Sequence, residues 1–172
     1  MPRHFPSVAA SKALSVLPSS ARFVLRGDQE TLNMAFSALT LPHSKTPCRA
    51  TVSGDRATLW LGPDERLLLA PEASASDLFN KIERALENLP HSCVEISHRQ
   101  IALQVQGPEA RDVLNAGCPL DLDPQAFPVG MCTRTLLGKA EIVLWHRTAN
   151  VFHVEVWRSF ADYVSRFLAE AH

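Results

Sequence analysis

The order of predicted secondary structure occurs twice in this chain, and that repeat limits the folds the chain can adopt. Each half reads as a strand, a helix, three short strands and a second helix. The halves are offset by about 80 residues, from Gly27 to Gly107 and from Cys48 to Cys132. This order predicts an α+β fold of two similar β-α-β-β-β-α modules, related by a pseudo-twofold axis that pairs their sheets.

In the first half, the predicted strand Phe23–Asp28 leads into a helix whose N-terminus Asp28 caps. The apolar positions of that helix are Leu32, Ala35, Phe36 and Leu39. Short strands are then predicted around the segments CRATVS, ATLWL and RLLLA. A second helix is predicted to begin at Ser76 and to bury Phe79, Ile82, Leu86 and Leu89.

In the second half, the predicted strand Ile101–Gly107 precedes a helix that has Pro108 in its first position and ends at Gly117. The predicted buried residues of this helix are Ala110, Val113 and Leu114. Strands are expected around CTRTLL, AEIVLW and FHVEVW, and the final helix follows them.

The segment VEVWRSFADYV marks the change from strand to helix near the C-terminus. Alternation over Val151–Trp157 predicts a strand that buries Phe152, Val154 and Val156. After Arg158 the spacing becomes helical, with predicted buried positions at Phe160, Tyr163, Val164, Phe167, Leu168 and Ala171. Ser159 stands where an N-cap belongs and Asp162 follows three residues later, which predicts a capping box.

Length and composition indicate one globular domain, or two small halves that share a core. The chain has 172 residues, of which 46% are hydrophobic and 20% are charged, and a chain of this size buries a substantial core. We predict an extended N-terminal arm over residues 1–21 and one domain over residues 22–172, made of repeats at about 22–90 and 99–172. The net charge of −1 provides no field for nucleic acid or an anionic membrane, and no apolar run reaches the roughly 18 residues of a membrane span.

The N-terminus and the cysteines favour a cytoplasmic protein. The apolar run in MPRHFPSVAASKALSVLPSS is too short and too interrupted for a secretory signal. Four scattered cysteines form no CxxC pair, and we interpret them as reduced thiols: Cys48, Cys93, Cys118 and Cys132.

Two pairs of potential metal ligands lie close together in the sequence. His146 and His153 flank a predicted turn, and His91 and Cys93 alternate in an extended segment. A structural zinc site takes about four ligands. Neither pair completes such a site, and exposed or hydrogen-bonded histidines are the simpler interpretation.

Cys93 has the neighbours that a catalytic thiol would need, with His91, Glu95 and His98 close in sequence. The same segment also reads as a short strand in which Cys93 is a packed thiol. A dinucleotide site is not indicated, because RGDQE and QGPEA contain one glycine each where the fingerprint GxGxxG has three.

Aromatic and arginine side chains are concentrated in the second half of the chain. Trp145, His153 and Trp157 are predicted to lie on strand faces opposite the core, with Arg134 and Arg158 near strand ends. Tryptophan and arginine are enriched in protein interfaces. We therefore take these five residues as a candidate subunit interface. The alternative is that the sheet of the other repeat covers this face.

Several segments resemble a known family. The C-terminal motifs are CPLDL at Cys118–Leu122, FPVG at Phe127–Gly130, TRTLLGKAEIVLW at Thr133–Trp145 and EVWRSFADYV at Glu155–Val164. They resemble the gamma subunit of heterotetrameric sarcosine oxidase. The upstream segments Leu59–Pro71 and Ile96–Leu114 are similar to the same family and to the wider aminomethyltransferase (glycine-cleavage T-protein) fold.

The resemblance implies a complex of four different subunits that oxidises sarcosine to glycine, with formaldehyde or methylenetetrahydrofolate and hydrogen peroxide as further products. It implies FAD and FMN in the beta subunit, NAD and a folate-binding domain in the alpha subunit, and zinc in the delta subunit. For this chain it implies the folate-domain fold without a cofactor, contact chiefly with the alpha subunit, and a role in assembly. The isolated chain is then expected to be colourless and inactive.

A stand-alone aminomethyltransferase-like protein that binds tetrahydrofolate itself is the alternative function. Such a protein needs a carboxylate for the pterin and an aromatic ring that stacks on it, and the best local matches are Asp64, Glu65 and Trp60. The acidic pair equally suits a hairpin turn with solvated charges. The catalytic aspartate motif of the folate relatives is not found, and we predict no catalytic, cofactor-binding or metal-binding residue in this chain.

Overall fold

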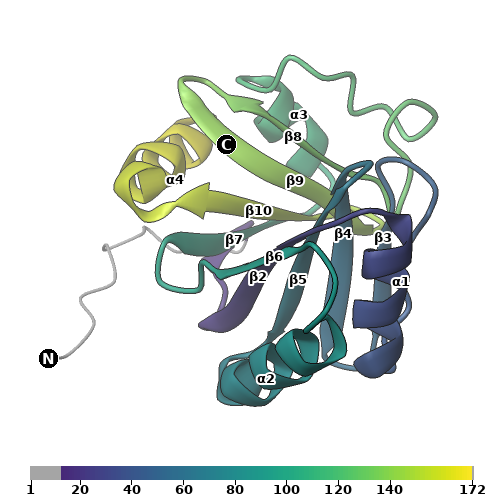
Figure 1. Ribbon diagram of the computed structural model, residues 1–172. Coiled ribbons are helices and arrows are strands. Elements are labelled where there is room, and N and C mark those ends of the chain that lie inside the picture. The colour runs from purple at the N-terminus through teal and green to yellow at the C-terminus, as the bar shows by residue number, and fades with distance from the viewer. Residues whose placement is uncertain (1–12, 172) are drawn as a thin grey trace, which may run out of the picture. The chain divides into compact units, whose positions relative to one another are not determined.

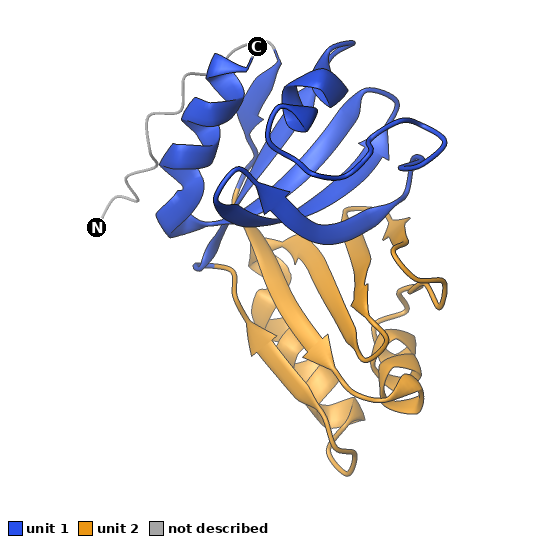
Figure 2. Ribbon diagram, turned by 90° about the horizontal axis from the view of Figure 1, so that it is seen from above, with its two compact units in different colours: residues 1–18, 98–172 blue, residues 19–97 orange. Residues whose placement is uncertain are grey.

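The computed structural model describes residues 13–171, which divide into two compact units. Unit 1 comprises residues 1–18 and 98–172, and unit 2 comprises residues 19–97 (Figure 2). Residues 1–12 of the predicted N-terminal arm lie outside the described residues. The prediction that both repeats form one domain, related by a pseudo-twofold axis, stays a prediction.

Unit 2 contains five strands and two α-helices, labelled in Figure 1. Its elements are β2 (Ser20–Arg26), α1 (Gln29–Ala38), β3 (Ala50–Ser53), β4 (Arg56–Gly62), β5 (Glu65–Pro71), the 3₁₀ turn η1 (Glu72–Ser74), α2 (Ala75–Ala85) and β6 (Ser92–Glu95). The strands form one antiparallel sheet in the order β3-β4-β5-β2-β6.

Unit 1 has the same kind of content. Its described elements are β1 (Leu14–Val16), β7 (Gln100–Gln106), α3 (Ala110–Asn115), β8 (Cys132–Leu137), β9 (Ala140–Thr148), β10 (Val151–Trp157), the 3₁₀ turn η2 (Arg158–Phe160) and α4 (Ala161–Glu170). Its antiparallel sheet has the order β8-β9-β10-β7-β1.

The sheet orders confirm the predicted α+β fold of two similar modules. Four strands of each module have the same spatial order, β3-β4-β5-β2 in unit 2 and β8-β9-β10-β7 in unit 1. The last of these four along the chain, β5 or β10, is followed by a 3₁₀ turn and a helix. The fifth strand differs in origin, because β6 follows its module in the chain whereas β1 precedes its own. Strand β1 was not predicted.

In unit 2, α1 and α2 pack on one face of the sheet (Figure 1). The cap predicted at Asp28 is confirmed, because the Thr31 N–H donates to its carboxylate at 2.8 Å. This hydrogen bond lowers the pKa of Asp28. The buried apolar residues of this core come from both helices, the residues that follow each helix, and strands β2 and β5: Ala21, Phe23, Leu25, Leu32, Ala35, Phe36, Leu39, Leu41, Leu68, Ala70, Leu78, Ile82 and Leu86.

In unit 1, α3 and α4 cover the sheet face that carries Phe152, Val154 and Val156, as the alternation predicted. The connection from α3 to β8 is tied to this core at Phe127, whose carbonyl lies 2.8 Å from Nδ1 of His146. The His146 ring is fully buried and stacks on Phe152, with 4.4 Å between ring centroids. His146 is therefore a packed core residue.

The predicted capping box at Ser159 is wrong. Residues Arg158–Phe160 form η2, and α4 begins at Ala161 without a side-chain cap. The Ala161 N–H donates to the Arg158 carbonyl, so the 3₁₀ turn satisfies a backbone donor that a cap would otherwise serve.

Two further boundary and burial predictions need correction. Helix α3 begins at Ala110, and Pro108 lies in the turn that precedes it. Three aromatic residues predicted as buried are partly exposed: Phe79, Phe160 and Tyr163.

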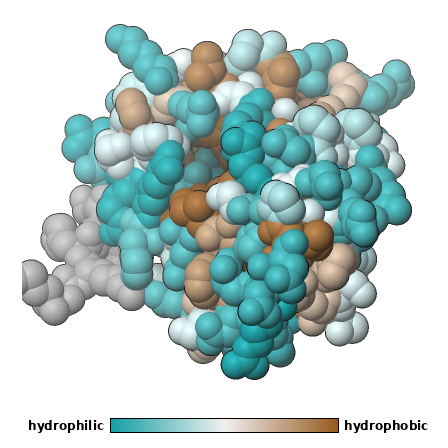
Figure 3. All heavy atoms as spheres, viewed as in Figure 1, coloured by the Kyte–Doolittle hydropathy of each residue, from teal (hydrophilic) through white to brown (hydrophobic). Residues whose placement is uncertain are grey.

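On the face shown in Figure 3, hydrophobic residues form small separate areas among hydrophilic ones.

Candidate functional site

The junction of β10 and η2 carries the predicted interface residues Trp157 and Arg158. Trp157 ends β10 opposite Gln100 of β7, and its side chain is 39% exposed. Phe160, at the end of η2, is 41% exposed. Two large aromatic side chains, three residues apart in the sequence, are therefore exposed at this junction.

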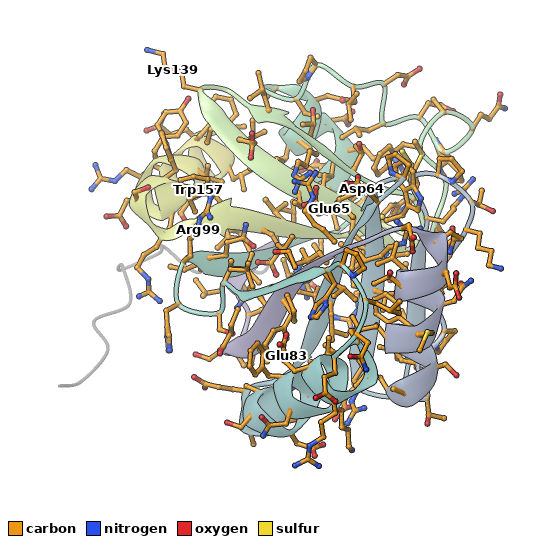
Figure 4. All side chains as sticks on the ribbon, in the orientation of Figure 1. Asp64, Glu65, Glu83, Arg99, Lys139 and Trp157 are labelled. Carbon is orange, nitrogen blue, oxygen red and sulfur yellow. The ribbon has the colours of Figure 1, made fainter. Side chains whose placement is uncertain are left out.

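Arg99 joins this junction from the start of β7. Its guanidinium lies over the Trp157 ring, 3.8 Å from the centroid, and the two side chains are adjacent in Figure 4. Arg158 is fixed from the same side, because its backbone N–H donates to the Arg99 carbonyl at 2.9 Å and its Nε donates to the His98 carbonyl at 3.0 Å. We refer to Arg99, Trp157, Arg158 and Phe160 as the aromatic–arginine corner.

Within the part of the chain that the structure describes, the two arginines of this corner use few of their donors: Arg158 donates through Nε, and the Arg99 guanidinium lies on the Trp157 ring. Among residues 13–171, neither Arg99 nor Arg158 forms an ion pair with a carboxylate. Even Asp162, one turn further along α4, does not pair with Arg158. The corner thus combines exposed aromatic area with two guanidinium groups that have no carboxylate partner among the described residues.

The other three predicted interface residues divide by exposure. Arg134 is exposed on the edge strand β8. Trp145 and His153 are only 5% and 7% exposed, and their rings contact each other with 5.7 Å between centroids. His153 Nε2 also donates to the buried Glu155 carboxylate at 2.7 Å. As predicted, Trp145 and His153 lie on the sheet face opposite the unit 1 core; their contact with a partner stays a prediction.

Cys93 and its predicted neighbour His91 make separate contacts in the structure. Burial, followed by the charges of Glu83 and Glu95, raises the pKa of Cys93 to about 12. His91 binds elsewhere, with Nδ1 2.8 Å from the Leu89 carbonyl and Nε2 3.3 Å from the Glu83 carboxylate. The thiol therefore packs beside the unit 2 core, as its alternative interpretation predicted.

The residues considered for folate lie in the β4–β5 hairpin. Asp64 and Glu65 occupy the turn and the start of β5 (Figure 4), and both carboxylates lie 3.5 Å from the Arg26 guanidinium. The Arg66 guanidinium lies 5.5 Å from the centroid of the Trp60 ring. These contacts form a salt-bridged hairpin turn, and folate binding at these residues stays an alternative prediction.

The histidines considered as metal ligands make other contacts in the structure. His146 is packed in the core and His153 is bonded to Glu155. Within residues 13–171, no three His, Cys, Asp or Glu side chains are grouped to hold a metal ion. Over the same described range, none of the helices has the length and apolar character to cross a membrane.

Sequence reasoning missed Arg99 and did not place Phe160 at the surface. Arg99 immediately precedes the residue that pairs with Trp157, so a predicted β7–β10 pairing would have brought it to the corner. The exposure of Phe160 follows from the 3₁₀ turn, which shifts it away from the face that α4 buries.

Solved structures first define the class of fold. Aminomethyltransferase T of the glycine cleavage system from Bartonella henselae superposes with a TM-score of 0.68 and 14% identity, covering 90% of this chain and 44% of that one. A chain of the heterotetrameric sarcosine oxidase from Corynebacterium sp. U-96 superposes with a TM-score of 0.85 and 27% identity, covering 92% of this chain and 82% of that one. The fold is therefore that of the aminomethyltransferase class.

Sequence comparison then gives the family. Residues 30–172 match the sarcosine oxidase, gamma subunit family. The chain is 33% identical over 131 residues to sarcosine oxidase subunit gamma of Corynebacterium sp. (strain P-1), covering 76% of this chain and 63% of the relative. This chain belongs to the sarcosine oxidase gamma subunit family. It spans between 56% and 65% of the length of the curated relatives that it matches.

Proposed function

We propose that this chain is a structural gamma subunit that supports assembly of a heterotetrameric sarcosine oxidase in the cytoplasm. The complex would oxidise sarcosine to glycine, with formaldehyde or methylenetetrahydrofolate and hydrogen peroxide as the other products. The observation that carries the proposal is the TM-score of 0.85 with a chain of a heterotetrameric sarcosine oxidase, together with membership of the gamma subunit family.

A non-catalytic role is supported by the contacts of the residues that could have supplied chemistry. The Cys93 thiol is partly buried with a raised pKa, the His146 ring is packed in a core, and Asp64 is salt-bridged at a hairpin turn. We therefore assign the chemistry to the alpha, beta and delta partner subunits. FAD, FMN, NAD and zinc are proposed to lie there, and the alpha subunit is proposed as the main contact.

Co-expression of the four subunits, with and without this chain, tests the proposal. With all four present, we expect a yellow complex that produces peroxide when sarcosine is added. Omission of this chain should reduce the yield of assembled complex, and the purified chain alone should show neither flavin absorbance nor peroxide production. Full assembly and activity without this chain would contradict the assembly role.

Titration of the isolated chain with tetrahydrofolate tests the alternative function. Our proposal predicts no tight binding. Tight binding that is lost in D64N or W60A, but retained in D55N on the neighbouring hairpin turn, would favour the stand-alone folate-binding protein instead.

A further inference from the structure

We infer that the aromatic–arginine corner is a docking surface for an acidic segment of a partner polypeptide. Such a segment would present carboxylates to Arg99 and Arg158 and an apolar side chain to Trp157 and Phe160. The inference rests on the proposed function for the existence of the partner. It adds which surface of this chain is used and what chemistry the partner brings.

Unit 2 contains a turn with the same backbone conformation, and the comparison shows which side chains this turn requires. In unit 2, Pro71 pairs with Ser20 and precedes η1, as Trp157 pairs with Gln100 and precedes η2. The backbone angles agree, with φ and ψ of −56° and 138° at Pro71 and −61° and 138° at Trp157. In both turns the first residue of the following helix donates its N–H to the first carbonyl of the 3₁₀ turn.

The two units carry different side chains on the same turn conformation. The positions in unit 2 that correspond to Arg99, Trp157, Arg158 and Phe160 hold Ser19, Pro71, Glu72 and Ser74. No aromatic ring and no arginine is needed to form this turn. The aromatic and arginine side chains of unit 1 are therefore explained by a contact outside the fold.

The charge of the corner determines the chemistry of its partner. Arg99 is held over an aromatic ring, and Arg158 uses only its Nε on a backbone carbonyl. A guanidinium offers a planar pair of donors that matches the two oxygens of a carboxylate. Because no carboxylate among residues 13–171 pairs with either arginine, an acidic partner is the complement.

The exposed rings identify the partner as a protein. Trp157 and Phe160 are 39% and 41% exposed, and a tryptophan beside arginine is the composition of an interface hot spot. A second copy of this chain is a poor complement, because a symmetric contact through this corner would bring like charges together.

The experiment measures the affinity of the full chain for its co-purified partner subunits, at low and at high sodium chloride. The test variant is R99S/R158E, which introduces the residues that unit 2 carries at the corresponding positions. We expect at least about a tenfold loss of affinity and a weaker dependence on salt. The matched control is R84E on α2, an exposed position in unit 2, which should bind as wild type does.

Each outcome separates the inference from the proposed function. If wild-type chain binds the partners and R99S/R158E binds equally well, the docking inference is wrong and the proposed function stands. If wild-type chain does not bind them, the proposed function fails first. If R99S/R158E assembles normally but loses binding to anionic vesicles or to an oligonucleotide, the corner serves a different ligand and the inference is overturned.

A second measurement needs no variant and so does not depend on folding of a mutant. Phenylglyoxal modifies accessible arginines, and mass spectrometry locates the modified residues. We expect Arg99 and Arg158 to be modified in the isolated chain and protected in the complex, while Arg84 is modified in both. Equal modification of Arg99 and Arg158 in the two states would overturn the inference.

Discussion

Gly54 and Gly138 form a matched pair of positions for a test of how the two units use the same turn. Gly54 lies between β3 and β4 and Gly138 between β8 and β9, with φ of +60° and +58°. An alanine Cβ at position 54 would meet nothing within 4 Å, whereas at position 138 it would overlap the Tyr163 hydroxyl. The backbone strain is the same at both positions. The difference in the free energy of unfolding lost by G54A and by G138A therefore measures the contact with Tyr163.

The magnitudes follow from these contacts. A left-handed backbone costs a residue with a Cβ about 1–2 kcal/mol, so G54A should lower the free energy of unfolding by that amount. G138A also displaces the Tyr163 hydroxyl, which accepts a hydrogen bond from the Lys139 N–H at 3.2 Å. Loss of such a bond costs about 0.5–1.5 kcal/mol. We therefore expect G138A to be more destabilising than G54A by about 1 kcal/mol.

Urea denaturation of the full chain, followed by circular dichroism, measures both losses. Y163F removes the hydroxyl and should relieve part of the cost of G138A, while the cost of G54A should not change. Equal losses for G54A and G138A, or a cost of G138A that Y163F leaves intact, would show that the contact with Tyr163 does not contribute to stability.

Three further predictions each concern one partly buried residue. Burial and, secondarily, the Arg66 guanidinium lower the pKa of His43 below its ordinary value of 6.5. The unfolded chain therefore takes up this proton first, and stability should fall as the pH drops below about 6.5, less steeply in H43Q, when denaturation at about pH 7.5 and about pH 5.5 is compared. Burial raises the pKa of Cys93 to about 12, so iodoacetamide should alkylate it more than about tenfold more slowly in the folded than in the urea-unfolded chain, as peptide mass spectrometry can follow. A Cβ at Gly117 would lie 2.5 Å from the Phe167 ring, so G117A should lower the free energy of unfolding in urea by about 1–3 kcal/mol, and F167L should restore part of it.

Each of these three predictions has a clear contrary result. Parallel pH profiles for wild type and H43Q would show that His43 does not couple folding to protonation. Rapid alkylation of Cys93 in the folded chain would place the thiol in contact with solvent. Wild-type stability of G117A would mean that the Phe167 ring can move aside without cost.

The order of strands and helices could be predicted because it rests on local patterns. Alternation found β10 with its bounds, Val151–Trp157. The cap at Asp28 was found because its partner, Thr31, lies within the same helical turn. The start of α2 was predicted within one residue, at Ser76 against Ala75.

Features that depend on distant segments could not be predicted in this way. Strand β1 has only three residues, too few to show alternation, and it is defined by its pairing with β7, where Leu14 lies opposite Val105. The stacking of Arg99 on Trp157 likewise requires β7 and β10 to be neighbours. Tertiary pairing, and not local propensity, creates both features.

In the candidate site, too, local patterns predicted some features and distant segments determine others. Alternation placed Trp145 and His153 on the face opposite the core, but it carries no information on whether that face is covered, and both are buried. At Ser159 a good local pattern was misleading, because a 3₁₀ turn satisfies the helix N-terminus through the Arg158 carbonyl. Trp157 and Arg158 are both exposed where β10 ends and η2 begins, and their role in a subunit interface stays a prediction.

We propose that this chain functions as one of four different subunits in a sarcosine-oxidising complex. The most direct measurement is the mass of the intact assembly recovered with the tagged chain from its native host, combined with flavin absorbance and sarcosine-dependent peroxide production. We predict a yellow, active assembly that contains this chain and three other polypeptides. Recovery of the chain alone or as a colourless homo-oligomer would contradict the account.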